Sequence, residues 1–242
     1  MATTIDPVLK PKRELLRFAP KRHWGLPGPG SRLHRHILVR LTSWDRSRVG
    51  FVEMDLVAHG GGSSADPFLY SLSVTEIATG WREGQAVMGR GQVGVFEALK
   101  QIRRRCHFRW RGVDCDNDTA FINDHLERYY RRERLQFTRS RPGRKNDNAY
   151  IEQKSYTHVR KVSGYERYDT PQEQALMNAL YEGEFRQFKN FFAPVMKLKS
   201  KVRTGGHVTR HYDIPRTPCE RLLASGTLKR EERRRLREST RG

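Results

Sequence analysis

Three acidic side chains, those of Asp55, Asp116 and Glu152, could hold the metal ions of a two-metal phosphoryl-transfer centre if the fold brings them together. Such a centre holds two divalent ions that activate the attacking oxygen and stabilise the leaving oxygen, so the protein mainly supplies converging carboxylates. Mg²⁺ prefers hard oxygen ligands of this kind. Cleavage or transfer of a phosphodiester is therefore the chemistry to consider.

Asp55 stands in the mostly apolar segment FVEMDLVA, residues 51–58, which is followed by the Gly-rich HGGGSS and predicts a strand that leaves into a loop. A carboxylate in a core-type strand is destabilising unless it is paired or binds a metal. A solvent-facing Asp at a sheet edge is the alternative. Glu53, two residues earlier, shares the face of Asp55 and competes for the same role.

Asp116 follows a predicted strand, residues 108–115, at the point where a turn leads into a helix. Taken alone, it is typical of a turn residue or a helix N-cap. Asp114 and Asp118 lie within two residues and compete with it. Only its place at the strand end, in combination with the other two acids, makes Asp116 a candidate.

Glu152 lies in the first half of a helix predicted from about 146 to 162, four residues after Asn148 and on the same helix face. An isolated helix Glu is usually a solvated surface residue. Here the N-x-x-x-E pattern follows a Pro-Gly and basic turn, and thirty-five residues separate Glu152 from Asp116. Spacing and context therefore favour Glu152 as a candidate ligand.

The elements that position these acids follow from hydrophobic periodicity. Strands are predicted over residues 51–58, 69–77, 81–89, 108–115 and 135–140, and helices over 93–105, 121–132, 146–162 and 170–188. Leu176, Leu180 and Tyr181 are expected on one side of the last helix. A strand meander followed by alternating strands and helices is the order of an α/β RNase H-like fold, in which a mixed five-stranded sheet is flanked by helices.

The positive charge of the chain is concentrated at its two ends. Lys and Arg outnumber Asp and Glu by 47 to 27, and the net charge of +20 indicates a polyanionic partner such as nucleic acid. The net charge is +8 over residues 1–50, +3 over 51–196 and +9 over 197–242. A nearly neutral middle with basic flanks is typical of a folded domain with arms that follow a phosphate backbone.

We predict three regions: a basic Pro/Gly-rich arm over residues 1–49, a catalytic core over 50–192, and a basic extension over 193–242 that is helical only near its end. The three cysteines include no CxxC pair and are odd in number, which argues against a disulfide framework and fits a reducing cytoplasm. No apolar run is long enough for a membrane span, and no signal peptide is recognisable.

Three motifs occur in order: FVEMDLV around Asp55, the D-N-x-[ST]-x-F-I-N segment from Asp116 to Asn123, and the N-x-x-x-E pattern that ends in Glu152. Together with the phrases DLVAH, TRSRP, KNDNAYIEQK and NFFAPVMKL, they make residues 48–225 resemble the DDE transposase and retroviral-type integrase catalytic core family. The similarity is greatest to bacterial insertion-sequence transposases. It implies an enzyme that cleaves DNA and joins it to a target, as in DNA integration by mobile elements.

The resemblance also implies roles for particular residues. Asp55, Asp116 and Glu152 would hold two Mg²⁺ or Mn²⁺ ions, and Asn117 and Asn148 would shape the site. Candidates for holding DNA phosphates near the Glu152 helix are Arg141, Arg144, Lys145 and Lys154. The expected partners are element-end and target DNA, bound by at least a dimer in the bacterial cytoplasm at the nucleoid, with no membrane involved.

One departure from the family pattern is that Asp118 stands where many members have the glycine of Asp-Asn-Gly, which bears on activity but not on the fold. Three alternatives stay open: an RNase H-fold nuclease without strand transfer, a non-catalytic DNA-binding remnant of a transposase, and a basic RNA- or ribosome-associated protein. No helix-turn-helix is recognisable ahead of the core, so we expect a fragment of a longer transposase.

Overall fold

The computed structural model describes residues 38–39, 44–45, 47–63, 65, 67–115, 120–139 and 159–238. Most of the predicted N-terminal arm and most of the predicted helix 146–162 lie outside these residues, so both stay predictions. The short helix α6 (Lys161–Ser163) falls at the end of the latter segment.

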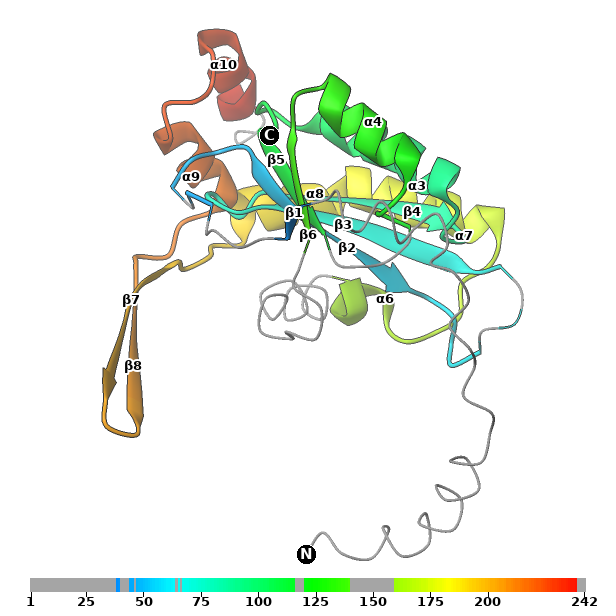
Figure 1. Ribbon diagram of the computed structural model, residues 1–242, viewed down its shortest axis with the longest axis horizontal. Coiled ribbons are helices and arrows are strands. Elements are labelled where there is room, and N and C mark those ends of the chain that lie inside the picture. Colours follow the sequence, from blue (N-terminus) through cyan, green and yellow to red (C-terminus); the bar gives the residue numbers. More distant parts are fainter. Residues whose placement is uncertain are drawn as a thin grey trace, which may run out of the picture.

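A mixed sheet forms the centre of the molecule, with the strand order β1-β6-β5-β2-β3-β4 (Figure 1). The strands are β1 (Leu38–Val39), β2 (Phe51–Ala58), β3 (Leu69–Glu76), β4 (Arg82–Met88), β5 (Gly112–Cys115) and β6 (Gln136–Arg139). β2, β3 and β4 form an antiparallel meander, whereas β5 and β6 run parallel to β2. The five predicted strands are confirmed, and β1 adds a two-residue edge strand that the sequence analysis did not predict.

Helices α3 (Gln92–Arg105) and α4 (Asp124–Arg132) cover one face of the sheet (Figure 1). Met54 of β2 points to this face, where its sulfur lies 3.9 Å from the Tyr130 hydroxyl of α4. Because strand side chains alternate between faces, the next residue, Asp55, points to the opposite side. A mixed sheet flanked by helices is the RNase H-like arrangement expected from the order of elements.

The helix predicted over residues 170–188 is broken in the structure. Its parts are α7 (Pro171–Glu182), α8 (Glu184–Gln187) and the π-helix η2 (Phe188–Phe192). α7 begins at a capping box between Thr170 and Glu173. It ends at Gly183, whose φ of −98° and ψ of −115° are not helical. None of the helices in the described ranges is long and apolar enough to cross a membrane.

One side of α7 packs against the sheet. Of the three residues expected together on one side of this helix, Tyr181 is buried and Leu180 is half-buried, whereas Leu176 is 73% exposed. The buried residues of α7 are Met177 and Tyr181, four residues apart. The Tyr181 hydroxyl lies 2.6 Å from Ser71 Oγ of β3, which brings α7 against the sheet on the face opposite α3 and α4.

The outer edge of β4 is covered by polar side chains. Asn178 of α7 accepts a hydrogen bond from Ala86 N at 2.7 Å and donates to Ala86 O, to which Gln174 also donates. Asn190 of η2 accepts from Arg82 N and donates to Arg82 O, both at 2.8 Å. α7 and η2 thereby satisfy backbone groups that would otherwise be open to pairing with another strand.

The chain after η2 contains a hairpin, β7 (Leu198–Thr204) and β8 (His207–Tyr212), followed by α9 (Pro218–Ala224) and α10 (Arg230–Glu238). α10 falls where a helix was predicted near the end of this extension, α9 is a helix outside that segment, and the strands β7 and β8 were not predicted. In Figure 1 the hairpin projects away from the sheet and its helices.

Candidate active site

Asp55 lies in β2, the interior strand that joins the antiparallel and parallel halves of the sheet. Its Cα partner on β3 is Ser73. On the other side of β2, Glu53 pairs with Asp114 of β5, which ends one residue later at Cys115. Asp55 therefore lies just past the carboxyl end of β5, where the chain leaves the sheet.

Three of the described acidic side chains, those of Glu53, Asp55 and Asp114, lie on the face of the sheet opposite α3 and α4, and they differ in exposure. Glu53 is 5% exposed and Asp114 is 1% exposed. The Thr138 hydroxyl donates to Asp114 Oδ1 at 2.5 Å. Asp55 is half-buried, and Leu56 N donates to its Oδ1 at 2.9 Å. Of these three acids, Asp55 has the largest exposed fraction.

The other predicted site residues lie outside the described residues. They are Asp116, Asn117, Asn148, Glu152 and the four basic candidates Arg141, Arg144, Lys145 and Lys154. The convergence of the three acids therefore stays a prediction. In the part of the chain that the structure describes, no three or more His, Cys, Asp or Glu side chains are grouped to hold a metal ion, and only one of the predicted ligands belongs to that part.

The chain beyond Glu152 re-enters the described structure at Val159, which is 3% exposed. The adjacent Arg160 donates from Nη2 to Ala58 O at 2.6 Å. Ala58 is the last residue of β2 and follows Asp55 by three positions. Arg160 therefore ties the segment after the predicted Glu152 helix to the strand that carries Asp55.

A buried histidine follows β2 directly. His59 has no exposed surface, and its Nε2 lies 2.8 Å from Ser71 Oγ, which in turn contacts the Tyr181 hydroxyl. Burial, and to a lesser extent the charge of Arg160, lower the pKa of His59 to about 4. The imidazole is therefore neutral at pH 7, and it links β2, β3 and α7.

This depressed pKa predicts a pH-dependent stability. The unfolded chain, in which the pKa of a histidine is about 6.5, binds the proton before the folded chain does, so stability falls as the pH drops from about 6.5 toward 4. Between pH 7 and pH 5, we expect the wild type to lose about 2 kcal/mol more unfolding free energy than His59→Gln does. Urea denaturation at both pH values measures this, and equal losses in the two proteins would show that His59 does not titrate in this way.

A narrow cleft on the Asp55 face of the sheet contains cations that the sequence analysis did not identify. Its polar lining includes Ser73, Arg82, Arg186 and Lys189. Burial, together with the nearby charges of Arg82 and Lys161, lowers the pKa of Lys189. Arg82 comes from β4, whereas Arg186 and Lys189 come from the consecutive elements α8 and η2, more than a hundred residues later, so no local motif signals the group.

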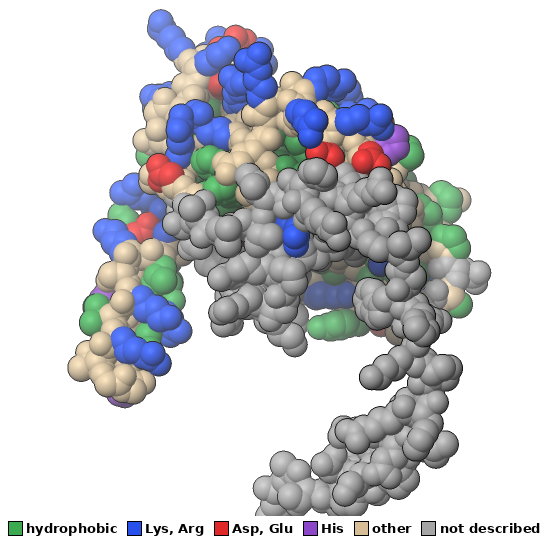
Figure 2. All heavy atoms as spheres, in the orientation of Figure 1, with side chains coloured by type: hydrophobic (Ala, Val, Ile, Leu, Met, Phe, Trp, Pro, Cys, Tyr) green, Lys and Arg blue, Asp and Glu red, His purple; other side chains and the backbone are tan. Residues whose placement is uncertain are grey.

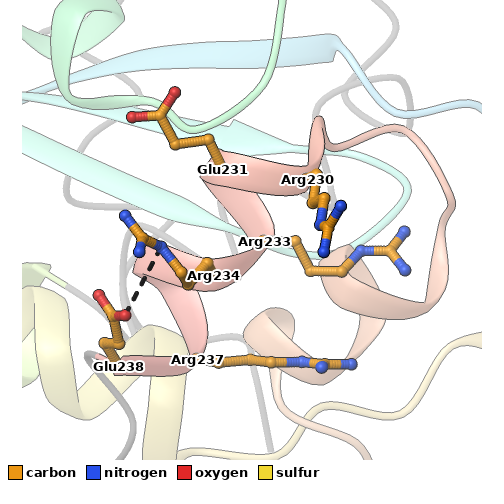
Figure 3. A pocket seen from close by; sticks show the side chains of 6 residues that line it. All are labelled: Arg230, Glu231, Arg233, Arg234, Arg237 and Glu238. Carbon is orange, nitrogen blue, oxygen red and sulfur yellow. Dashed lines mark ion pairs between the residues drawn. The ribbon is translucent and has the colours of Figure 1, made fainter.

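A separate surface hollow of about 650 Å³ lies at α10 (Figure 3). It is lined by Arg230, Glu231, Arg233, Arg234, Arg237 and Glu238. Figure 3 shows three of the arginines extending to one side of the helix, while Arg234 pairs with Glu238 at 3.7 Å on the other. No residue of β2 lines this hollow, so it is distinct from the surroundings of Asp55.

Comparison with known proteins gives one curated relative. No protein-family model matches the chain. The uncharacterized protein y4rM of Sinorhizobium fredii is 38% identical over 221 residues, which cover 91% of this chain. The chain spans 62% of the length of that relative.

Two solved structures share part of the backbone arrangement. One is a chain of a simian T-cell lymphotropic virus intasome in complex with PP2A regulatory subunit B56 gamma, with a TM-score of 0.46 and 10% identity over 60% of this chain and 50% of that chain. The other is the catalytic core domain of BIV integrase, with a TM-score of 0.44 and 17% identity over 72% of this chain and 94% of that chain.

Proposed function

We propose that the chain is the catalytic core of a DDE-type DNA transposase or integrase. The observation that carries the proposal is the position of Asp55, a partly exposed carboxylate on an interior strand of an RNase H-like sheet, just past the carboxyl end of β5. The sequence resemblance supplies two further acids: Asp116, immediately after β5, and Glu152, with thirty-five residues between them. DNA cleavage followed by strand transfer is the activity that this set of acids supports best.

In this proposal, Asp55, Asp116 and Glu152 bind two Mg²⁺ or Mn²⁺ ions, and Asn117 and Asn148 shape their surroundings. A carboxylate oxygen is the kind of ligand that these ions prefer. When bound, the ions activate water or a 3′-hydroxyl and stabilise the leaving oxygen. β2 holds the aspartate in place, because its backbone pairs with β3 and the following N–H fixes Oδ1. Such preorganisation reduces the rearrangement that the reaction requires.

The substrate in this proposal is DNA, namely element ends and a target. The basic residues Arg141, Arg144, Lys145 and Lys154 would hold its phosphates. Joining two element ends to one target requires at least two copies of the chain. The protein would act on bacterial chromosomal DNA at the nucleoid.

A strand-transfer assay on branched DNA that mimics a joined element end tests the proposal. With Mn²⁺ the wild type should resolve the branch and join the ends, and Glu152→Gln or Asp116→Asn should lower the rate at least about a hundredfold, because each removes an anionic ion ligand. Activity that survives either substitution would overturn the triad. Cleavage by the wild type without any joining would instead identify a nuclease.

A further inference from the structure

The β7–β8 hairpin is a surface that the catalytic acids do not use. Every residue of β7 is exposed, and in β8 only Val208 is partly covered. A two-stranded hairpin with so little burial is only marginally stable by itself. Its position on the molecule must therefore be fixed at its base.

Polar contacts at the base hold the hairpin against the sheet. Lys197 N donates to Asp213 Oδ1 at 2.6 Å, and Asp213 N donates to Lys197 O at 2.9 Å. Both terminal nitrogens of the Arg221 guanidinium contact the Asp213 carboxylate, which lowers the pKa of Asp213 to about 2. The Lys197 ammonium donates to Ile77 O, just after β3, at 2.8 Å. The hairpin is thus an arm with a defined direction from the core.

One face of this arm is cationic. Residues directly opposite on antiparallel strands share a face, and Lys201 pairs with Arg210, while Arg203 lies two residues further along the same face. Like charges opposite each other destabilise a hairpin. No Asp or Glu occurs between residues 197 and 212 to offset them. Figure 2 shows the Lys and Arg side chains along the projecting hairpin.

We propose that this cationic face, formed by Lys201, Arg203 and Arg210, binds the phosphate backbone of duplex DNA. Phosphates between the opposed cations would relieve their repulsion, and Lys and Arg are the usual phosphate contacts. A seven-residue strand is about 20 Å long, and a two-stranded ribbon fits the major groove. The inference rests on the proposed function for the identity of the nucleic acid, and it adds a binding site away from the catalytic acids.

The test compares two triple variants that remove the same amount of charge. Lys201→Gln/Arg203→Gln/Arg210→Gln alters the hairpin, and the control Arg128→Gln/Arg131→Gln/Arg132→Gln alters exposed cations of α4. Fluorescence anisotropy with a random-sequence duplex over a range of salt concentrations gives the affinity and its salt dependence. For the hairpin variant, we expect the Kd to rise about tenfold or more at low salt, and the slope of log K against log salt to fall by about one per removed cation.

The control variant should show a much smaller change, and both variants should remain folded and melt cooperatively, because all six side chains are exposed. A hairpin variant that binds the duplex as tightly as the wild type, with the same slope, overturns this inference while leaving the proposed function intact. A changed oligomeric state in sedimentation, with unchanged DNA affinity, would also overturn it, because the hairpin would then be an interface between copies. If the wild type binds no duplex, the proposed function fails as well.

Discussion

Replacing Asp55 by Asn is expected to slow DNA strand transfer about a thousandfold while the fold stays intact. The change keeps the size of the side chain but removes the negative charge that would hold a divalent ion, a loss of about 4 kcal/mol in transition-state stabilisation. Because Asp55 is half-buried and shares its face with Glu53 and Asp114, we expect the unfolding free energy to change by less than about 1 kcal/mol. Single-turnover assays on branched DNA with Mn²⁺, together with urea denaturation, measure the two effects.

Glu53→Gln is the matched control, because Glu53 lies on the same strand and face but is 5% exposed. Per folded molecule, this variant should keep its strand-transfer rate within a few-fold of the wild type. The opposite pattern, with an active Asp55→Asn and an inactive Glu53→Gln, would show that the ion is bound at Glu53 and that the assignment within β2 is wrong.

The sheet could be predicted from the sequence because its strands are buried and therefore apolar. β2, β3 and β4 each fall within a residue or so of the predicted bounds, and α3 does so because Val95, Leu99 and Ile102 repeat at helical spacing. β5 is shorter than predicted, because residues 108–110 extend the apolar pattern outside the paired strand, and the hydrogen bonds of Arg111 to Gly50 and Gln136 mark where pairing begins. Periodicity thus reports burial more reliably than it reports strand pairing.

The hairpin could not be predicted from burial, since almost none of its side chains is buried. The signal that was present is local: Gly205-Gly206 separates two segments of alternating residues, and the φ of Gly205 is 59°. Similarly, the capping box between Thr217 and Glu220 marks the start of α9. The turn glycines therefore indicate the hairpin and the capping box indicates α9, although hydrophobic periodicity predicts neither element.

For the candidate site, the sequence was sufficient to single out Asp55 but not to separate it from Glu53 on physical grounds. The two residues differ in the exposure of their side chains, because Glu53 is 5% exposed whereas Asp55 is half-buried, and a single sequence does not show this difference. The cations Arg82 and Lys189 are brought to one cleft by the packing of η2 against β4. A contact between positions more than a hundred residues apart leaves no pattern in a single sequence.

Replacing Asn190 by Ala is expected to be among the most destabilising single changes in the molecule. Asn190 has no exposed surface, and its amide satisfies both the N–H and the C=O of Arg82 on the edge strand β4. Removing it leaves two backbone groups without a partner where water has little access, which costs about 3 to 4 kcal/mol. Such a loss is a large part of the stability of a typical domain, and urea denaturation measures it.

Asn178→Ala is the matched control for this prediction. Asn178 makes the same pair of contacts to Ala86 of β4, but it is only half-buried, and Gln174 also donates to Ala86 O at 3.1 Å. Water and Gln174 can therefore replace most of what is lost, and we expect a cost of about 1 kcal/mol. Equal destabilisation by the two variants would mean that the burial of Asn190 adds nothing to the loss of unfolding free energy. Water would then reach the backbone N–H and C=O of Arg82, contrary to what the structure indicates.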